Sequence, residues 1–108
     1  MTVKRLAEEN GFKCLALPCP ERDVKGAYIG DLLSWVMGRA EADNAWITIM
    51  SNINVLAVAS LADVSCVILA EGVSLDDNVL ATAAEKSVNV LSSELSAFEI
   101  ASRLVGNV

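Results

Sequence analysis

The sequence predicts an α/β domain, in two or three layers, with a mainly parallel central sheet and room for a mixed edge strand. The strongest observation is the segment 45–70, which has the pattern of a βαβ unit. Residues 46–50 alternate bulky and β-branched side chains over a strand's length, and residues 64–69 form a second short apolar run. Between them, residues 55–62 are too few to span a membrane and enough for a crossover helix.

Two further observations support this fold class. A third apolar run over 88–91 continues the alternation of strand and helix, so the strands 46–50, 66–70 and 88–91 are expected to be parallel. The chain of 108 residues has no linker, repeat or low-complexity stretch, and it is long enough to bury a core. We therefore expect a single domain over residues 1–108.

The N-terminal elements are a helix and an edge strand. Thr2 can cap a helix over residues 3–10, which ends at Gly11, the residue best suited to a left-handed C-terminal cap. Residues 12–17 read as a strand that could join the sheet as an antiparallel edge. Pro18 and Pro20 then force an irregular connection, because neither can donate a hydrogen bond to a ladder.

The next segment leads into an apolar helix. Residues 26–30 are expected to be a short extended or turn segment, with glycines where the backbone needs a positive φ or a close approach. Asp31 is expected to cap a helix over residues 32–39. This helix and the one over 55–62 are apolar nearly all the way round, and such helices are covered on every side.

The surplus apolar helix surface predicts a homodimer. An apolar fraction of 54% is high for a small domain, and one sheet face cannot cover both helices. Trp35 and Met37 are the expected anchors, since aromatic residues and Met are enriched in interface cores. The candidate interface residues are Leu33, Trp35, Val36, Met37, Val55 and Val58. The alternative is that the two helices pack only on each other and on the sheet.

Two more helices complete the predicted domain. Residues 74–77 resemble a capping box that starts a helix running to about Ser87. Its expected inner face is formed by Leu80, Ala83 and Ala84. Residues 96–99 form a clear capping box for the last helix. The apolar side of that helix is expected to be Phe98, Ala101 and Val105, opposite Glu99, Ser102 and Arg103.

Composition argues against several classes of partner. The net charge is −6, and residues 40–108 hold nine acidic and two basic groups, which would repel a nucleic acid backbone. Polar residues interrupt every apolar run well before about 18 residues, so no membrane span is expected. The N-terminus reads as a polar helix start and not as a signal peptide, and a cytoplasmic location is therefore expected.

The residues that usually carry catalysis do not form a recognisable pattern, so we expect no enzymatic activity, cofactor or metal. The chain has no histidine, phosphate-binding loop, dinucleotide fingerprint or nucleophile elbow. Cys14, Cys19 and Cys66 form no metal-binding pair and read as reduced structural thiols. The acidic pair Asp76 and Asp77 fits helix capping. Asp63 and Glu71 read as solvated turn residues.

Ligand binding is better supported, because open parallel sheets bind ligands beyond the carboxyl ends of their strands. At that edge, backbone amides and nearby polar side chains could hold a phosphate or carboxylate. The candidate residues are Ser51, Asn52, Asn54, Glu71, Gly72, Ser92 and Ser93. Arg22, Lys25 and Tyr28 add two cations and an aromatic that could face an anion or lie on the surface. The alternative is that all of these residues serve only as caps and turns.

Four segments together resemble a stand-alone DRTGG domain. They are ERDVKGAYIGDLLS at 21–34, WITI at 46–49, NVLAVA at 54–59 and LSSELSAFE at 91–99. The resemblance covers nearly the whole chain. In the motif that gives the family its name, Glu21-Arg22 stands where the family has Asp-Arg, and Gly26-Ala27 stands where it has Gly-Gly.

The resemblance implies an α/β module related to the N-terminal domain of HPr kinase/phosphorylase, also found in phosphotransacetylases and between CBS domains in some inorganic pyrophosphatases. In those proteins it is an accessory domain, often at a dimer contact, and catalysis is carried elsewhere. We therefore expect a non-catalytic regulatory or assembly module that forms a homodimer and can act on a partner enzyme. The alternative function is a sensor that binds a small anionic metabolite or adenine nucleotide at the carboxyl ends of the strands.

Overall fold

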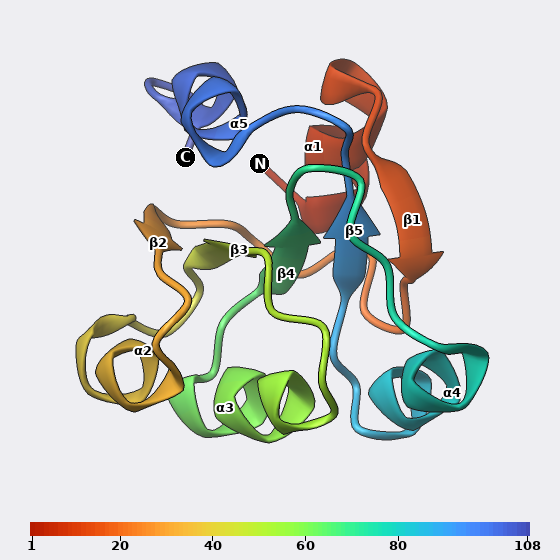
Figure 1. Cartoon of the computed structure of the whole chain (residues 1–108). Helices are drawn as coiled ribbons and strands as arrows, with labels where there is room; N and C mark the ends of the chain where they lie inside the picture. Colours follow the sequence, from red (N-terminus) through yellow and green to blue (C-terminus); the bar gives the residue numbers. More distant parts are fainter.

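The computed structural model describes residues 1–108 and contains five helices and five strands (Figure 1). In chain order the elements are α1 (Val3–Asn10), β1 (Lys13–Ala16), β2 (Ala27–Ile29), α2 (Leu33–Arg39), β3 (Ala45–Thr48), α3 (Asn54–Ala62), β4 (Cys66–Leu69), α4 (Asp77–Glu85), β5 (Val90–Ser92) and α5 (Ala97–Leu104). No helix is long and apolar enough to cross a bilayer.

The strands form one sheet in the order β1-β5-β4-β3-β2. Strands β2 to β5 are parallel to their neighbours, and β1 pairs antiparallel with β5 at one edge. This confirms the predicted α/β class, the parallel central strands and the antiparallel edge strand. The segment 26–30, expected to be extended or a turn, contains β2, which forms the opposite edge of the sheet.

Helices cover both faces of the sheet, which gives three layers. Helices α2, α3 and α4 connect successive parallel strands and lie on one face, whereas α1 and α5 lie on the other (Figure 1). Alternate residues of β3 separate two cores: Trp46 packs with the first set of helices and Ile47 with the second. Strands β3 and β4 are buried along their whole length, as expected for parallel strands that are covered on both faces.

Helix caps that depend on local sequence are confirmed. The Thr2 hydroxyl accepts a hydrogen bond from the Arg5 amide at 3.2 Å, and Gly11 ends α1 with φ of 66°. The Ser96 hydroxyl and the Glu99 carboxylate form the reciprocal hydrogen bonds of a capping box. Both patterns need only neighbouring residues, which is why they could be read from the sequence.

Two other predicted caps are wrong. Asp31 does not cap α2; its carboxylate accepts hydrogen bonds from the Thr48 hydroxyl at 2.8 Å and the Ile49 amide at 3.0 Å instead. Asp31 therefore links the start of α2 to the end of β3, a contact between segments that are distant in sequence. Helix α4 begins only at Asp77, and Asp76 makes no side-chain capping bond.

The inner faces of the last two helices also differ from the prediction. In α4 the buried residues are Val79 and Ala83, whereas Leu80 is half-buried and Ala84 is exposed. In α5 the buried residues are Ile100 and Leu104. Phe98 is 71% exposed and Val105 78% exposed. Helix α5 has two adjacent apolar stripes, and periodicity alone does not say which of them faces the sheet.

Candidate ligand cavity and exposed apolar surface

The loops that leave β4 and β5 diverge to opposite faces of the sheet. The chain passes from β4 to α4 on one face and from β5 to α5 on the other. In open α/β sheets, ligands bind where neighbouring strands send their connections to opposite sides, because a crevice opens between the two loops. In this chain that crevice lies beyond the carboxyl ends of β4 and β5.

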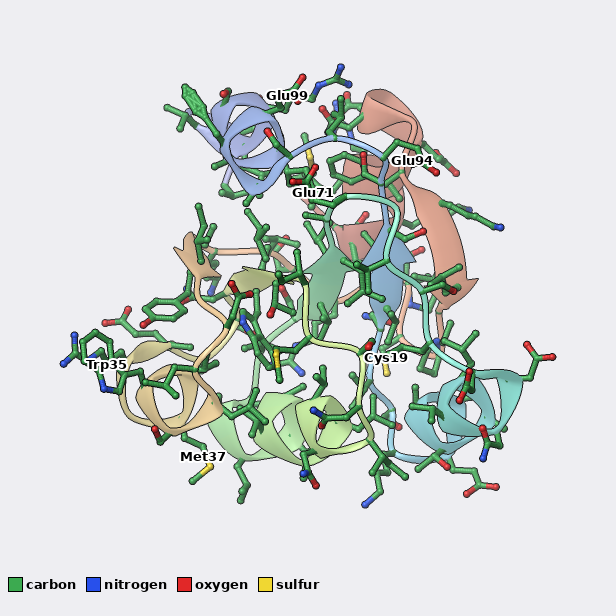
Figure 2. The ribbon with its side chains drawn as sticks, in the orientation of Figure 1. Cys19, Trp35, Met37, Glu71, Glu94 and Glu99 are labelled. Atoms are coloured by element: carbon green, nitrogen blue, oxygen red, sulfur yellow. The ribbon has the colours of Figure 1, made fainter.

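A cavity of about 420 Å³ occupies this position, within the usual range for small-molecule sites. Polar residues from both loops line it, together with the end of α1, the start of β1 and one residue of α5. The lining residues are Asn10, Gly11, Lys13, Leu15, Gly72, Val73, Ser74, Ser92, Ser93, Glu94, Leu95 and Arg103. Figure 2 shows Glu71 and Glu94 at this end of the sheet.

Backbone hydrogen bonds join the two loops that form the cavity. The Gly72 amide donates to the Ser93 carbonyl at 2.9 Å, and the Glu71 amide donates to the Leu95 carbonyl at 2.9 Å. The Ser93 hydroxyl accepts a hydrogen bond from the Leu95 amide at 3.1 Å. The loops therefore hold each other in place, and the cavity has a defined wall on that side.

Three of the predicted ligand residues meet in this cavity, namely Gly72, Ser92 and Ser93. Ser51, Asn52 and Asn54 do not line it. They follow β3, whose connection lies on the same face as that of β4, so no crevice separates the two strands. The Asn52 side chain accepts a hydrogen bond from the Asn54 amide at 2.9 Å and shapes the start of α3.

Lys13 and Arg103 line the cavity, although the sequence did not indicate them as site residues. Lys13 is the first residue of β1 and is in register with Ser92 of the antiparallel β5, which brings it to the carboxyl end of that strand. Arg103 lies on α5, where the sequence placed it on the polar side of the helix. The available signal was the antiparallel orientation of residues 12–17, which puts the start of that strand beside the end of its neighbour.

Arg22 lies at the opposite end of the sheet and does not contribute to the cavity. Its guanidinium Nη2 donates to Asp63 Oδ1 at 2.8 Å, to the Asp63 carbonyl at 2.6 Å and to Asp43 Oδ1 at 3.1 Å. Partial burial lowers the pKa of Arg22, but the hydrogen bonds to Asp63 and Asp43 outweigh this effect and raise it. Arg22 is thus an internal cross-link between two turns, and Asp63 is one of its partners, not simply a solvated turn residue.

Lys25 also lies away from the cavity. Its backbone amide donates to the Asp43 carbonyl at 2.8 Å, and its carbonyl accepts from Asn44 Nδ2 at 2.8 Å, both at the amino end of β3. Tyr28 packs against Gly30, where a Cβ would be 2.8 Å from the tyrosine ring. The segment that carries the family motif therefore stabilises the amino end of the sheet.

The predicted interface residues divide into two groups. Val36, Val55 and Val58 are buried and Leu33 is half-buried, because α2 and α3 pack on each other and on the sheet. Trp35 and Met37 are 52% and 51% exposed, and Figure 2 shows them pointing away from the domain in different directions. The Arg39 guanidinium carbon lies 3.8 Å from the centroid of the Trp35 ring and covers part of it.

Exposed apolar side chains lie on both sides of edge strand β2. An apolar groove of about 280 Å³ separates β2 from the end of the chain, and it is lined by Ala27, Ile29, Ala101, Leu104, Val105 and Val108. On the other side, Leu32 and Trp35 are exposed at the start of α2. We define the β2-edge surface as Ile29, Leu32, Trp35, Phe98 and Val105, all of which are about half exposed or more.

The outer edge of β2 has no strand beside it. The Gly30 amide donates to the Ile47 carbonyl at 3.2 Å, and the Gly26 carbonyl accepts from the Ala45 amide at 3.0 Å. Since alternate residues of a strand bond to opposite neighbours, the backbone groups of Ala27 and Ile29 point away from the sheet. An edge of this kind is a template for another strand.

Residues 24–106 match the family model of the DRTGG domain. No curated protein sequence matches the chain. Among solved structures, the chain is similar to the CBS and DRTGG domains of the regulatory region of a pyrophosphatase from Clostridium perfringens, in complex with its activator, diadenosine tetraphosphate.

That structural likeness has a TM-score of 0.77 at 10% sequence identity, and it covers 96% of this chain. The chain spans 46% of the length of the pyrophosphatase region. At this level of identity the likeness shows the fold alone, which is a mixed α/β sheet with one antiparallel edge strand.

Proposed function

This chain belongs to the DRTGG domain family, and we propose that it is a non-catalytic, cytoplasmic regulatory module that forms a homodimer through the β2-edge surface. The observation that carries this proposal is the coincidence of an unpaired edge strand with exposed apolar side chains on both of its sides. The regulated activity would belong to a partner enzyme or to another domain. The expected relation to the N-terminal domain of HPr kinase/phosphorylase stays a prediction.

A second copy of the chain fits this surface for a geometric reason. A two-fold axis beside β2 would run the two β2 strands antiparallel, so that the outward backbone groups of Ala27 and Ile29 could pair with the same groups of the partner. Trp35 and Val105, on opposite sides of the strand, would then meet apolar side chains of the other copy. The interface would bury this apolar surface. Monomeric proteins rarely expose large contiguous apolar patches, so burial against a second copy explains the surface.

Light scattering over a dilution series tests the homodimer. Trp35→Glu and Val105→Glu each place a charge in the proposed interface and should convert the dimer to a monomer. Leu61→Glu is the matched control, because Leu61 is an exposed apolar residue like Val105 but lies on α3, outside the β2-edge surface. A monomeric mass for the unaltered chain at all concentrations would contradict the proposal. So would a folded Trp35→Glu variant that keeps the dimer mass.

Sensing of a small anionic metabolite or adenine nucleotide is the second candidate function. The cavity beyond β4 and β5 favours this function, because the cationic side chains Lys13 and Arg103 line it in an otherwise acidic protein. The similar pyrophosphatase region binds a nucleotide activator, which is a polyanion of this class. A thermal-shift series with phosphate, AMP, ATP and diadenosine tetraphosphate tests it, because a ligand in excess of its Kd raises Tm by mass action.

A further inference from the structure

We infer that Lys13 and Arg103 together bind a single phosphoryl group in the cavity beyond β4 and β5. The inference rests on the second candidate function, anion sensing, and is independent of the homodimer. The chain has eight basic residues against 14 acidic ones, and two of the eight line this one cavity from opposite ends of the chain. Such a concentration of positive charge in an acidic protein favours an anionic ligand.

Neither cation forms an ion pair within the protein. The ion pairs of the structure involve the N-terminus, Arg5 and Arg22, and none involves Lys13 or Arg103. Arg103 Nη1 donates to the Asn10 carbonyl at 3.2 Å, at the end of α1. This bond holds the guanidinium at the cavity wall, and the other N–H groups stay available because a guanidinium has five donors.

Neutral donors complete the site. Ser74, Ser92 and Ser93 line the same cavity, and of their hydroxyls that of Ser74 already donates to the Leu75 carbonyl at 3.5 Å. The Ser93 oxygen already accepts a hydrogen bond from the Leu95 amide, so its own hydrogen remains free to donate. A phosphoryl group has several acceptor oxygens and no carbon surface to bury, which suits a lining in which polar residues outnumber apolar ones.

Glu94 limits how much negative charge the cavity can accept. Its carboxylate lines the cavity with the two cations and forms an ion pair with neither of them. Two cations and one carboxylate leave a net charge of about one positive unit, which suits one phosphoryl group better than a polyphosphate chain. The ligand class is therefore inorganic phosphate or a small phosphate monoester.

Calorimetry with inorganic phosphate, at constant ionic strength, tests this site. Saturable binding is expected, and Lys13→Gln and Arg103→Gln should each weaken it by at least about tenfold, since each removes a charge-assisted hydrogen bond. Lys4→Gln is the matched control, because Lys4 is exposed on α1 outside the cavity. Arg103→Lys retains the charge and should bind phosphate more tightly than Arg103→Gln.

The outcomes separate the inference from the proposed functions. Saturable phosphate binding that Lys13→Gln and Arg103→Gln leave unchanged would overturn the site while anion sensing stands. The absence of saturable binding to phosphate and to a phosphate monoester such as AMP would overturn the site and its ligand class. Light scattering on phosphate-free samples tests the homodimer separately.

Discussion

The Glu94 carboxylate lies directly against Gly72, so that a Cβ built on Gly72 would be 2.5 Å from Glu94 Oε2. Gly72 has φ of +72°, a conformation that other residues rarely adopt, so the backbone at this position favours glycine. The contact places a negative charge at the wall of the cavity that we propose for a phosphoryl group. Glu94 therefore opposes the ligand that Lys13 and Arg103 attract.

Replacing Glu94 by Gln should increase phosphate affinity by about three- to tenfold, because the substitution removes a like charge and keeps the side-chain shape. Calorimetric titration with phosphate at low ionic strength measures the change. Glu85→Gln, on the exposed side of α4, is the control of equal charge change and should have no comparable effect. A loss of affinity in Glu94→Gln would mean that Glu94 supports the ligand instead of repelling it.

Arg22→Lys should lower the free energy of unfolding by about 1–2 kcal/mol. Lysine keeps the charge but cannot reproduce the fork with which Arg22 reaches both Asp43 and Asp63. The midpoint of urea unfolding measures the loss. Arg5→Lys is the control, since the Arg5–Glu9 pair is exposed and should contribute less than about 1 kcal/mol. Equal losses in the two variants would argue against a special role for Arg22.

Local patterns were sufficient to predict much of the fold. The βαβ pattern of residues 45–70 required only periodicity and length, and it correctly gave parallel strands. The caps at Thr2, Gly11 and Ser96 were likewise readable from neighbouring residues. The strand at 12–17 was expected to be able to join as an antiparallel edge, and the structure places it there beside β5.

Contacts between distant segments decided the rest. The sequence suggested that Arg22 could face an anionic ligand, but in the fold its guanidinium forms ion pairs with Asp43 and Asp63. Lys13 reaches the cavity only through its register with Ser92. Val36 and Val55 looked like interface residues, but α2 and α3 cover them by packing together. None of these pairings has a periodic signal in the sequence. Of the predicted ligand residues, the cavity is therefore lined only by Gly72, Ser92 and Ser93, and the sequence did not indicate Lys13 or Arg103.

Cys66 should make stability depend on pH above about 9. Burial raises the pKa of its thiol to about 12, from an ordinary value of 9.0. Between these values the unfolded chain loses the thiol proton and the folded chain keeps it, so the unfolded state binds fewer protons and stability falls as pH rises. Below about pH 9 the effect is absent, because both states are protonated.

The stability advantage of the unaltered chain over Cys66→Ala should therefore shrink by about 1.4 kcal/mol for each pH unit above 9. Urea unfolding of both proteins at about pH 8 and pH 10 measures this difference, in which the other titrating groups cancel. Cys19→Ala is a control in a half-buried position. An advantage that stays constant over this range would show that the Cys66 thiol ionises equally in both states.

Helix α5 connects the proposed phosphate site to the proposed dimer surface. It carries Arg103 at the cavity, whereas Phe98 and Val105 lie on the β2-edge surface. A phosphoryl group bound non-covalently by Arg103 would restrict the position of α5. A helix that is already restricted loses less conformational entropy when a second copy of the chain binds. Phosphate should therefore tighten the dimer, by a factor of about five or more. Light scattering over a dilution series, with and without saturating phosphate, measures this factor.

Because coupling between two binding sites is reciprocal, the dimer should bind phosphate more tightly than monomeric Val105→Glu does by the same factor. Arg103→Gln should dimerise without responding to phosphate, and a phosphate-dependent dimer in that variant would refute the role of α5.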